Sequence, residues 1–234
     1  MKLYDYLIDL VLPNRCACCN AFIEWNKTIC DNCLSEIVLS GDDVCLLCGK
    51  TNCVCDTGLH YDACVTGAYY DGVVRDGIIN LKLDKGINFA KYFSDVLSDR
   101  LKDRKLVNEI DIITSVPTTR ERLSERGYNQ AQEIAVLISK KINKPFFEKL
   151  LIKTDKELVQ HSLDYESRKE AVKGAYEYFD SADISEKTIL LCDDVITTSS
   201  TLNECSLQLK KSGAKKVICV AIATTRLKFD KCKK

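Results

Sequence analysis

Residues 189–202 read ILLCDDVITTSSTL, and this stretch decides the fold. The four apolar residues at its start predict a strand that is buried on both faces, as in a parallel sheet. Two adjacent acids, Asp193 and Asp194, follow directly. Because open α/β sheets bind their ligands at the carboxyl ends of the strands, we expect both acids at a ligand-binding edge.

Small hydroxyl residues follow the acids and enter a predicted helix. They are Thr197, Thr198, Ser199, Ser200 and Thr201. Free N–H groups and the dipole at a helix N-terminus favour an anion, and hydroxyl groups add donors to phosphate oxygens. The loop therefore combines a phosphate site with two carboxylates that can accept hydrogen bonds from a sugar diol, as a phosphorylated ribose requires. The alternative is an ordinary acidic turn in which Ser or Thr only caps the helix.

From Val65 onward, strand and helix patterns alternate. Apolar runs predict strands at 64–72, 109–117, 145–153, 175–179, 187–195 and 215–225. Helical spacing of apolar residues predicts helices at 73–84, 88–103, 129–143 and 202–213. The polar stretch 154–174 is predicted to be a loop with partial helix. This order predicts an α/β fold, a mainly parallel sheet with helices on both faces, preceded by a small Cys-rich domain.

The chain has 14 cysteines, and 10 of them lie within the first 64 residues. The opening MKLYDYLIDLVLPNR shows no pattern of a cleaved signal peptide, and its apolar run is too short to span a bilayer. We expect residues 1–15 to form a short docking helix and expect no transmembrane segment. Clustered thiols without an export signal are typical of metal ligands in a reducing compartment, so we expect a cytoplasmic protein.

The cysteine pairs have the spacing of zinc ribbons. One site is predicted at Cys16, Cys19, Cys30 and Cys33, and a second at Cys45, Cys48, Cys53 and Cys55. A two-residue gap lets both thiolates of a tight turn reach one tetrahedral ion, and four thiolates leave no open position, so two structural zinc ions are expected. Several alternatives stay open: iron in place of zinc, free buried thiols, Cys18 in place of Cys16, and His60 in place of Cys53.

The predicted domains are an N-terminal helix with a double zinc-ribbon region at 1–63 and an α/β domain at 64–234. The formal net charge is zero, but residues 1–64 carry −5 and the remainder +5. Any surface for nucleic acid is therefore expected in the second domain, for example at Arg120, Arg122 and Arg126. The planar fork of arginine also suits pyrophosphate, and these side chains follow the strand at 109–117.

Residues 189–202 resemble the motif by which type I phosphoribosyltransferases bind phosphoribosyl pyrophosphate (PRPP). The resemblance implies that Asp193 and Asp194 hold the ribose hydroxyls in the catalytic site and that residues 197–201 hold the 5′-phosphate. It also implies Mg²⁺ bound together with PRPP. Ser199 departs from the pattern, because that family usually has glycine there, and glycine serves where φ is positive or the backbone approaches a ligand closely.

The whole chain resembles the ComF family of competence proteins. The resemblance rests on the order of the Cys pairs, on SVPTTRERLSERGYNQA (115–131), on the loop from Gln160 to Arg168 with Gly174, and on the acids. It extends to the opening LYDYLIDLVLPNRC and to INLKLDKG around Lys82. Two departures are Ser115, where Pro is frequent, and Ala171, where Asn is frequent. The resemblance implies that Arg120, Arg126 and Arg168 contact PRPP, and that 154–174 covers it.

The resemblance implies a PRPP-binding protein that acts in DNA uptake during natural transformation. Its implied partners are single-stranded DNA and a DNA-uptake helicase, which would bring the chain to the inner face of the membrane. The alternative is an active phosphoribosyltransferase that transfers phosphoribose from PRPP to an unknown acceptor. The chain has no N-terminal catalytic cysteine, so the sequence does not predict a glutaminase half.

Overall fold

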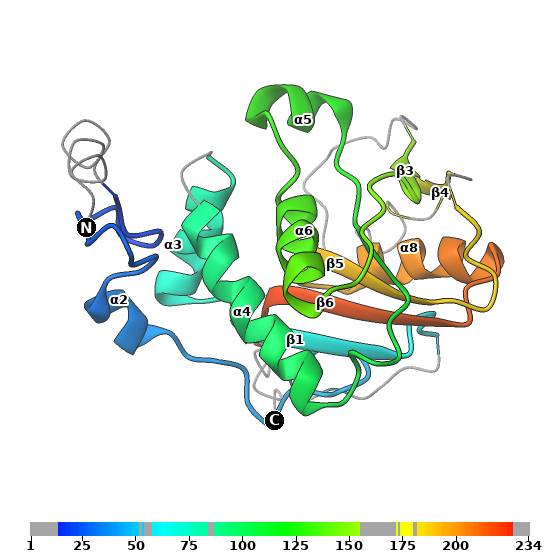
Figure 1. Ribbon diagram of the computed structural model, residues 1–234, viewed down its shortest axis with the longest axis horizontal. Coiled ribbons are helices and arrows are strands. Elements are labelled where there is room, and N and C mark those ends of the chain that lie inside the picture. Colours follow the sequence, from blue (N-terminus) through cyan, green and yellow to red (C-terminus); the bar gives the residue numbers. More distant parts are fainter. Residues whose placement is uncertain are drawn as a thin grey trace, which may run out of the picture.

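The computed structural model describes residues 14–51, 53, 58–83, 87–154, 172, 174–179 and 182–226. At its centre lies a four-stranded parallel sheet with the strand order β1-β6-β5-β2 (Figure 1). Its strands are β1 (Ala63–Tyr69), β2 (Ile112–Ser115), β5 (Thr188–Ile196) and β6 (Lys216–Thr224). A separate antiparallel pair consists of β3 (Leu151–Lys153) and β4 (Tyr176–Tyr178).

Helices cover both faces of the sheet, which confirms the predicted fold class (Figure 1). On β5, Leu190 and Cys192 belong to one buried cluster, which they share with α3 (Gly72–Leu81), α4 (Ile87–Asp103) and α6 (Gln130–Ile142). Ile189 and Leu191 point to the other face and belong to a second cluster with α8 (Ser200–Lys211). The alternation follows from the two-residue period of a strand.

Close packing of α3 on α4 fixes the end of α3 near the sheet. A Cβ atom at Gly77 would lie 2.1 Å from the Phe89 ring, so only glycine allows this approach. The rings of Phe89 and Phe93 are buried and lie 4.7 Å apart between centroids. Lys82 is the C-cap residue of α3, and its position is set by this packing.

The cysteine-rich region packs against α3 (Figure 1). It contains the short helix α2 (Asp31–Glu36), and its buried Cys16, Ala17 and Ile29 belong to the same apolar cluster as α3 and α4. The Asn80 side chain donates hydrogen bonds to the carbonyls of Ala17 and Cys18 at 3.0 and 2.8 Å. The boundary between residues 63 and 64 stays a prediction.

Two local predictions differ from the structure. Of the strand expected at 145–153, only Leu151–Lys153 forms β3, while Phe146 makes one isolated bridge to Ile113 before the chain turns away. The helix α5 (Arg120–Arg126) was not expected. The predicted helix at 1–15 and the loop at 154–174 lie largely outside the described residues. No helix in the described part of the chain is long and apolar enough to cross a membrane.

Candidate functional site

The two acids lie in the part of β5 that extends beyond the end of the neighbouring strand β2. The last residue pair between these strands is Ser115 with Cys192, and Pro117 ends any further pairing because it has no N–H to donate. On the other side, Asp193 is still paired with Ala221 of β6. Burial is complete up to Cys192 and becomes partial at Asp193. The acids therefore border an opening on the β2 side of the sheet.

This opening is a cleft of about 350 Å³, which lies at the lower end of the range for small-molecule sites. Its lining combines acidic, cationic, amide and hydroxyl side chains from β5, α3, α5, α6 and β3. The lining residues are Lys82, Val116, Pro117, Thr118, Arg122, Arg126, Asn129, Gln130, Ala131, Lys153, Tyr176, Asp193, Asp194, Val195, Thr197 and Thr201.

The acids occupy a strongly charged environment. Lys82 Nζ lies 3.0 Å from a carboxylate oxygen of Asp194 and forms an ion pair with it. Burial and then the charge of Asp194 raise the pKa of Asp193 well above its ordinary value. The Asp194 N–H opposes this rise, because it donates to Asp193 Oδ1 at 2.8 Å. On the opposite wall, burial and then the charge of Arg122 lower the pKa of Lys153. Both shifts have burial as their first cause, which disfavours the charged form of each group.

Helix α5 directs two arginines into the cleft. Thr119 caps its start by accepting from Arg122 N at 3.2 Å, and Gly127 ends it at φ 77°. Arg122 and Arg126 are four residues apart, so they lie on one helix face, and both line the cleft. Arg120 lies about 200° around the helix from Arg122 and is exposed. Of the arginines expected at the ligand edge, Arg122 and Arg126 line the cleft, while Arg120 is not among its lining residues and stays a predicted contact.

Gln130, at the start of α6, presents a donor that lacks a partner. Arg126 Nη1 donates to Gln130 Oε1 at 3.2 Å, and because arginine only donates, the contact fixes which amide atom is oxygen. Gln130 Nε2 is buried and has no hydrogen-bond partner among the described residues. Its neighbour Asn129 caps α6 and donates to the Val116 carbonyl at 2.9 Å. A buried N–H donor at the cleft is matched to a ligand oxygen.

The hydroxyl loop surrounds a second, smaller hollow. Residues 197–201 line about 20 Å³ of space, which holds about one water-sized group. Ser199 has φ 63°, the left-handed conformation in which glycine is preferred, and α8 begins at the next residue. Thr197 and Thr201 face both the hollow and the cleft, whereas Thr198, Ser199 and Ser200 line only the hollow and the opposite side of the loop.

Four of the predicted ligands form the first cysteine group. The Sγ atoms of Cys16, Cys19, Cys30 and Cys33 all lie within 4.8 Å of one another, and those of Cys19 and Cys30 are 3.8 Å apart. Four sulfurs at about 2.3 Å from one tetrahedral ion would be about 3.8 Å apart, so the set fits zinc. Cys18 is not in the group.

Backbone N–H groups also prepare the first cysteine group for an ion. Cys30 N donates to Cys16 Sγ at 3.3 Å, and Cys33 N donates to Cys30 Sγ at 3.4 Å. Burial raises the pKa of the Cys16 thiol, but hydrogen bonds from the backbone of Cys19 and Cys30 outweigh it and lower the pKa to about 6. Burial raises the pKa of Cys18 to about 12, as for a thiol of the core.

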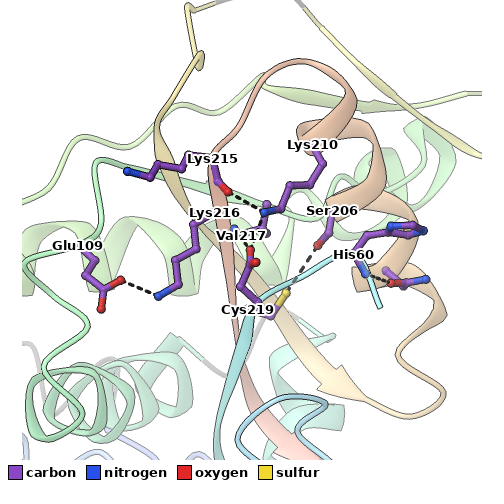
Figure 2. A network of polar contacts seen from close by, with 10 residues as sticks. His60, Glu109, Ser206, Lys210, Lys215, Lys216, Val217 and Cys219 are labelled. Carbon is purple, nitrogen blue, oxygen red and sulfur yellow. Dashed lines mark hydrogen bonds and ion pairs between the residues drawn. The ribbon is translucent and has the colours of Figure 1, made fainter. Parts of the chain in front are cut away.

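The second cysteine group has three described members. The Sγ atoms of Cys45, Cys48 and Cys53 lie within 4.8 Å of one another, and Leu47 N donates to Cys45 Sγ at 3.4 Å. Cys55, the predicted fourth ligand, lies outside the described residues. The His60 side chain does not join the group. Figure 2 shows His60 at the other end of this segment, where its backbone N–H donates to Asn203 Oδ1 of α8 at 2.7 Å.

Two family models match the chain, a double zinc ribbon domain at residues 7–65 and a phosphoribosyl transferase domain at residues 125–231. Competence protein ComFC of Streptococcus pneumoniae is 26% identical over 204 residues, with 82% of this chain and 86% of that protein covered. Competence protein F of Haemophilus influenzae is 30% identical over 121 residues, 50% of this chain and 53% of that protein. The chain thus contains a double zinc ribbon and a phosphoribosyl transferase domain, and it is similar to competence proteins over most of its length.

DNA utilization protein YhgH of Escherichia coli is also similar to this chain, at 25% identity over 202 residues that cover 85% of each. The double zinc ribbon match and the two cysteine groups together support structural zinc. The phosphoribosyl transferase match includes β5 and the hydroxyl loop, and it begins at Glu125 within α5.

The structure adds site residues that sequence reasoning did not select. Lys82, Lys153 and Tyr176 line the cleft beside the acids, and Lys50 contacts the hydroxyl loop from the ribbon side. Only Lys82 had a signal in the sequence, since it lies in the INLKLDKG stretch that resembles the ComF family. Three predicted contacts of the covering loop, Gln160, His161 and Arg168, lie outside the described residues.

Proposed function

We propose that the chain binds PRPP, or a closely related phosphoribosyl compound, in the cleft at the carboxyl end of β5. One observation carries this proposal: a single cleft combines a carboxylate pair, a wall of cationic side chains and a hydroxyl loop at a helix N-terminus. Each of these parts suits a different portion of the ligand. The double zinc ribbon and the transferase-domain match are consistent with it.

The 5′-phosphate would bind in the loop 197–201. Backbone N–H groups at the start of α8 provide donors, and the helix dipole favours a negative charge there. Thr197 and Thr201 face both the small hollow and the cleft, so a phosphate at this position would be continuous with a ribose in the cleft.

The ribose diol would bind to Asp193 and Asp194, the two acids that we place in the catalytic or binding centre. Their oxygens are also suited to hold Mg²⁺, which supplies charge against the pyrophosphate of the ligand. In the empty cleft, Lys82 balances Asp194 through its ion pair. A ligand that brings cations and hydroxyl donors to Asp194 releases Lys82 for phosphate oxygens.

The pyrophosphate would face the cationic wall. Arg122, Arg126 and Lys153 line this side, and the unpartnered Gln130 Nε2 adds a neutral donor. A polyanion relieves the mutual repulsion of these cations, which is the same repulsion that helps to lower the pKa of Lys153. Arg168 stays a predicted contact that the loop 154–174 would bring to the ligand, and Arg120 is exposed outside the cleft lining.

The biological role that we propose is DNA uptake. It rests on the names of the similar proteins, which are competence proteins and a DNA utilization protein. Single-stranded DNA and a DNA-uptake helicase are the proposed partners, and the cytoplasmic side of the membrane is the proposed location. The positive balance of residues 65–234 is compatible with a DNA-binding surface on the second domain.

The decisive experiment is calorimetry of PRPP with Mg²⁺ on the parent and on the Asp193→Asn, Asp194→Asn double variant. We expect the double variant to lose affinity by about ten- to hundredfold per residue, because each removes a charged hydrogen-bond partner worth roughly 1.5–3 kcal/mol. Asp76→Asn on the exposed side of α3 is the control and should bind as the parent does. Unchanged affinity in the double variant would show that the ligand site is elsewhere.

Release of pyrophosphate from bound PRPP separates binding from transfer. A chain that binds PRPP and releases pyrophosphate only slowly, in the absence of an acceptor, acts as a ligand-sensing module under the assay conditions. Rapid release upon addition of one candidate acceptor would establish the active phosphoribosyltransferase instead. The same cleft residues are required in both cases, so the double Asn variant serves as the blank.

A further inference from the structure

The second cysteine group lies directly behind the hydroxyl loop. Lys50, between Cys48 and Cys53, donates a hydrogen bond from Nζ to the Thr198 carbonyl at 2.9 Å. The two residues are 148 positions apart in the sequence.

Close backbone packing fixes the distance between the cysteine turn and β5. Gly49 has φ 71°, and a Cβ atom there would lie 2.5 Å from Cys64 Sγ and 3.0 Å from Ile196 Cδ1. Cys64 N donates to the Leu46 carbonyl at 2.8 Å. Residues 45–50 therefore rest on the start of β1 and on the end of β5, immediately before the loop.

Residues 58–60, which follow the cysteine group, are hydrogen-bonded to the first turn of α8, directly after the loop. Asn203, in the first turn of α8, accepts from the His60 N–H at 2.7 Å and donates from Nδ2 to the Gly58 carbonyl at 3.2 Å. Its own backbone N–H donates to the Ser199 carbonyl at 2.9 Å. Lys50 and residues 58–60 thus line one cavity together with Thr198, Ser199 and Ser200 of the loop.

We infer that Lys50 is a positioning residue through which metal binding at the second cysteine group and phosphate binding at the loop 197–201 are linked. The peptide bond between Thr198 and Ser199 is planar and trans, so its carbonyl and its N–H point in opposite directions. Since Lys50 holds the carbonyl, it turns the Ser199 N–H away from the ribbon. This orients one donor of the loop before a phosphate arrives, and it rests on the proposed phosphate site.

A metal ion at the second cysteine group would hold the turn that carries Lys50. Lys50 is flanked by Cys45, Cys48 and Cys53, whose sulfurs converge on one point. Backbone bonds from Cys45 N to the Lys50 carbonyl and from Gly49 N to the Cys45 carbonyl, both 2.9 Å, already shape the turn, and an ion would add a link between Cys45, Cys48 and Cys53 on both sides of Lys50. Linkage of binding free energies is reciprocal, so the phosphate ligand must in turn raise the affinity for this metal by the same factor.

Hydrogen exchange of the full-length chain tests the contact without any ligand. Lys50→Met keeps the apolar stem and removes the ammonium, and we expect faster exchange over residues 197–203 with β5 unchanged. Cys45→Ser, which opens the second cysteine group, should give the same result. Lys211→Met is the matched control. Lys211 is exposed on α8 and, like Lys50, lines the cavity on the side of the loop opposite the cleft. Cys19→Ser, in the first group, should leave 197–203 unchanged. Equal exchange in all four variants and the parent overturns the inference.

Metal release tests the linkage itself. In equilibrium competition with a chromophoric chelator, one of the two zinc ions of the parent should bind about fivefold to tenfold more tightly when PRPP and Mg²⁺ are present, and this difference should vanish in Lys50→Met. PRPP affinity should fall about fivefold to tenfold in Lys50→Met, within the usual range of coupling between sites, and stay unchanged in Lys211→Met. If the parent binds no PRPP, the proposed function is refuted. The hydrogen-exchange result still tests the contact between Lys50 and the Thr198 carbonyl, because it needs no ligand. PRPP binding with no effect on either zinc ion overturns the linkage.

Discussion

At the scale of single residues, Asp193 is a carboxylate held in a position that disfavours its charge. Its pKa is raised above its ordinary value, so the folded chain keeps this proton to a higher pH than the unfolded chain does. The stabilising contribution of this proton is therefore fully present below the pKa of the unfolded chain, about 3.9. It is lost as the pH rises through the pKa of the folded chain. The cost of the charge is consistent with a group that functions only when a ligand or cation is bound.

Replacing this acid should therefore stabilise the empty chain. We expect Asp193→Asn to raise the melting temperature near neutral pH, and we expect the gain to shrink toward pH about 4, where the parent also carries the proton. Thermal unfolding of the zinc-loaded chain at several pH values measures this. The exposed Asp76→Asn change is the reference and should stay within about 0.5 kcal/mol of the parent. A constant difference between Asp193→Asn and parent at every pH would mean that Asp193 is already ionised normally.

Ser199 offers a second residue-scale prediction. A non-glycine residue in the left-handed region costs roughly 1–2 kcal/mol, and part of this is recovered by its lower entropy in the unfolded chain. Ser199→Gly should raise stability by about 0.5–1 kcal/mol, or about 2–4 °C, and should leave PRPP affinity equal or better. Ser200→Gly, one position into α8, should destabilise by a similar amount. A stable Ser200→Gly and an unstable Ser199→Gly would contradict the assigned backbone conformation.

At the scale of secondary structure, α5 decides which arginines reach the ligand. Arg122 and Arg126 face the cleft and Arg120 faces solvent, so we expect Arg122→Gln to weaken PRPP binding by about tenfold or more and Arg120→Gln to leave it nearly unchanged. Calorimetry of the two single variants side by side tests this. A larger loss in Arg120→Gln would require α5 to be rotated when the ligand binds.

Elements with an apolar signature could be predicted from the sequence. The acids and the hydroxyl loop could be predicted because the apolar run, the two acids and the start of the helix follow one another in the sequence. Each strand of the central sheet was also expected close to its observed place. Helix α5 has no buried residue, so it has no apolar period to detect. Its signals were only the caps, Thr119 at the start and Gly127 at the end.

The contributions of Lys82 and Lys50 could not be predicted, because they depend on packing between distant segments. Lys82 reaches Asp194 since Gly77 allows α3 to approach Phe89, and Lys50 reaches Thr198 since Gly49 allows its turn to rest on β1 and β5. The sequence does not indicate which residues pack against either glycine. That Arg122 and not Arg120 lines the cleft has the same origin, because it depends on the rotation of a helix that was not expected.

At the scale of the whole molecule, charge is divided between the ribbon and the α/β domain. Several lysines of the second domain are engaged internally: Figure 2 shows Lys216 paired with Glu109 at 2.6 Å and Lys210 donating to the Lys215 carbonyl at 2.7 Å. Arg120 is exposed and forms no ion pair within 4.0 Å among the described residues. A surface for the DNA backbone is therefore better placed near α5 than near these lysines.

We expect weak binding of single-stranded DNA without sequence preference, and we expect its affinity to fall steeply with salt. The slope of log affinity against log salt should be about −0.7 for each phosphate contacted, so Arg120→Gln should reduce it by about 0.7 if Arg120 contacts one phosphate. Fluorescence anisotropy with a labelled oligonucleotide at several salt concentrations measures the slope. Binding that ignores salt, or an Arg120→Gln variant with the slope of the parent, would contradict a DNA surface at α5.

The contact between Lys50 and Thr198 also has a consequence for synthesis. At about 5–20 residues per second, the 148 residues that separate them take roughly 7–30 s to emerge from the ribosome. The ribbon is thus available to acquire its ions long before the loop that it supports has been made. Zinc starvation during translation would produce chains whose later domain folds onto an unfinished neighbour, and zinc supplied afterwards would have to enter a turn already covered by β1 and β5.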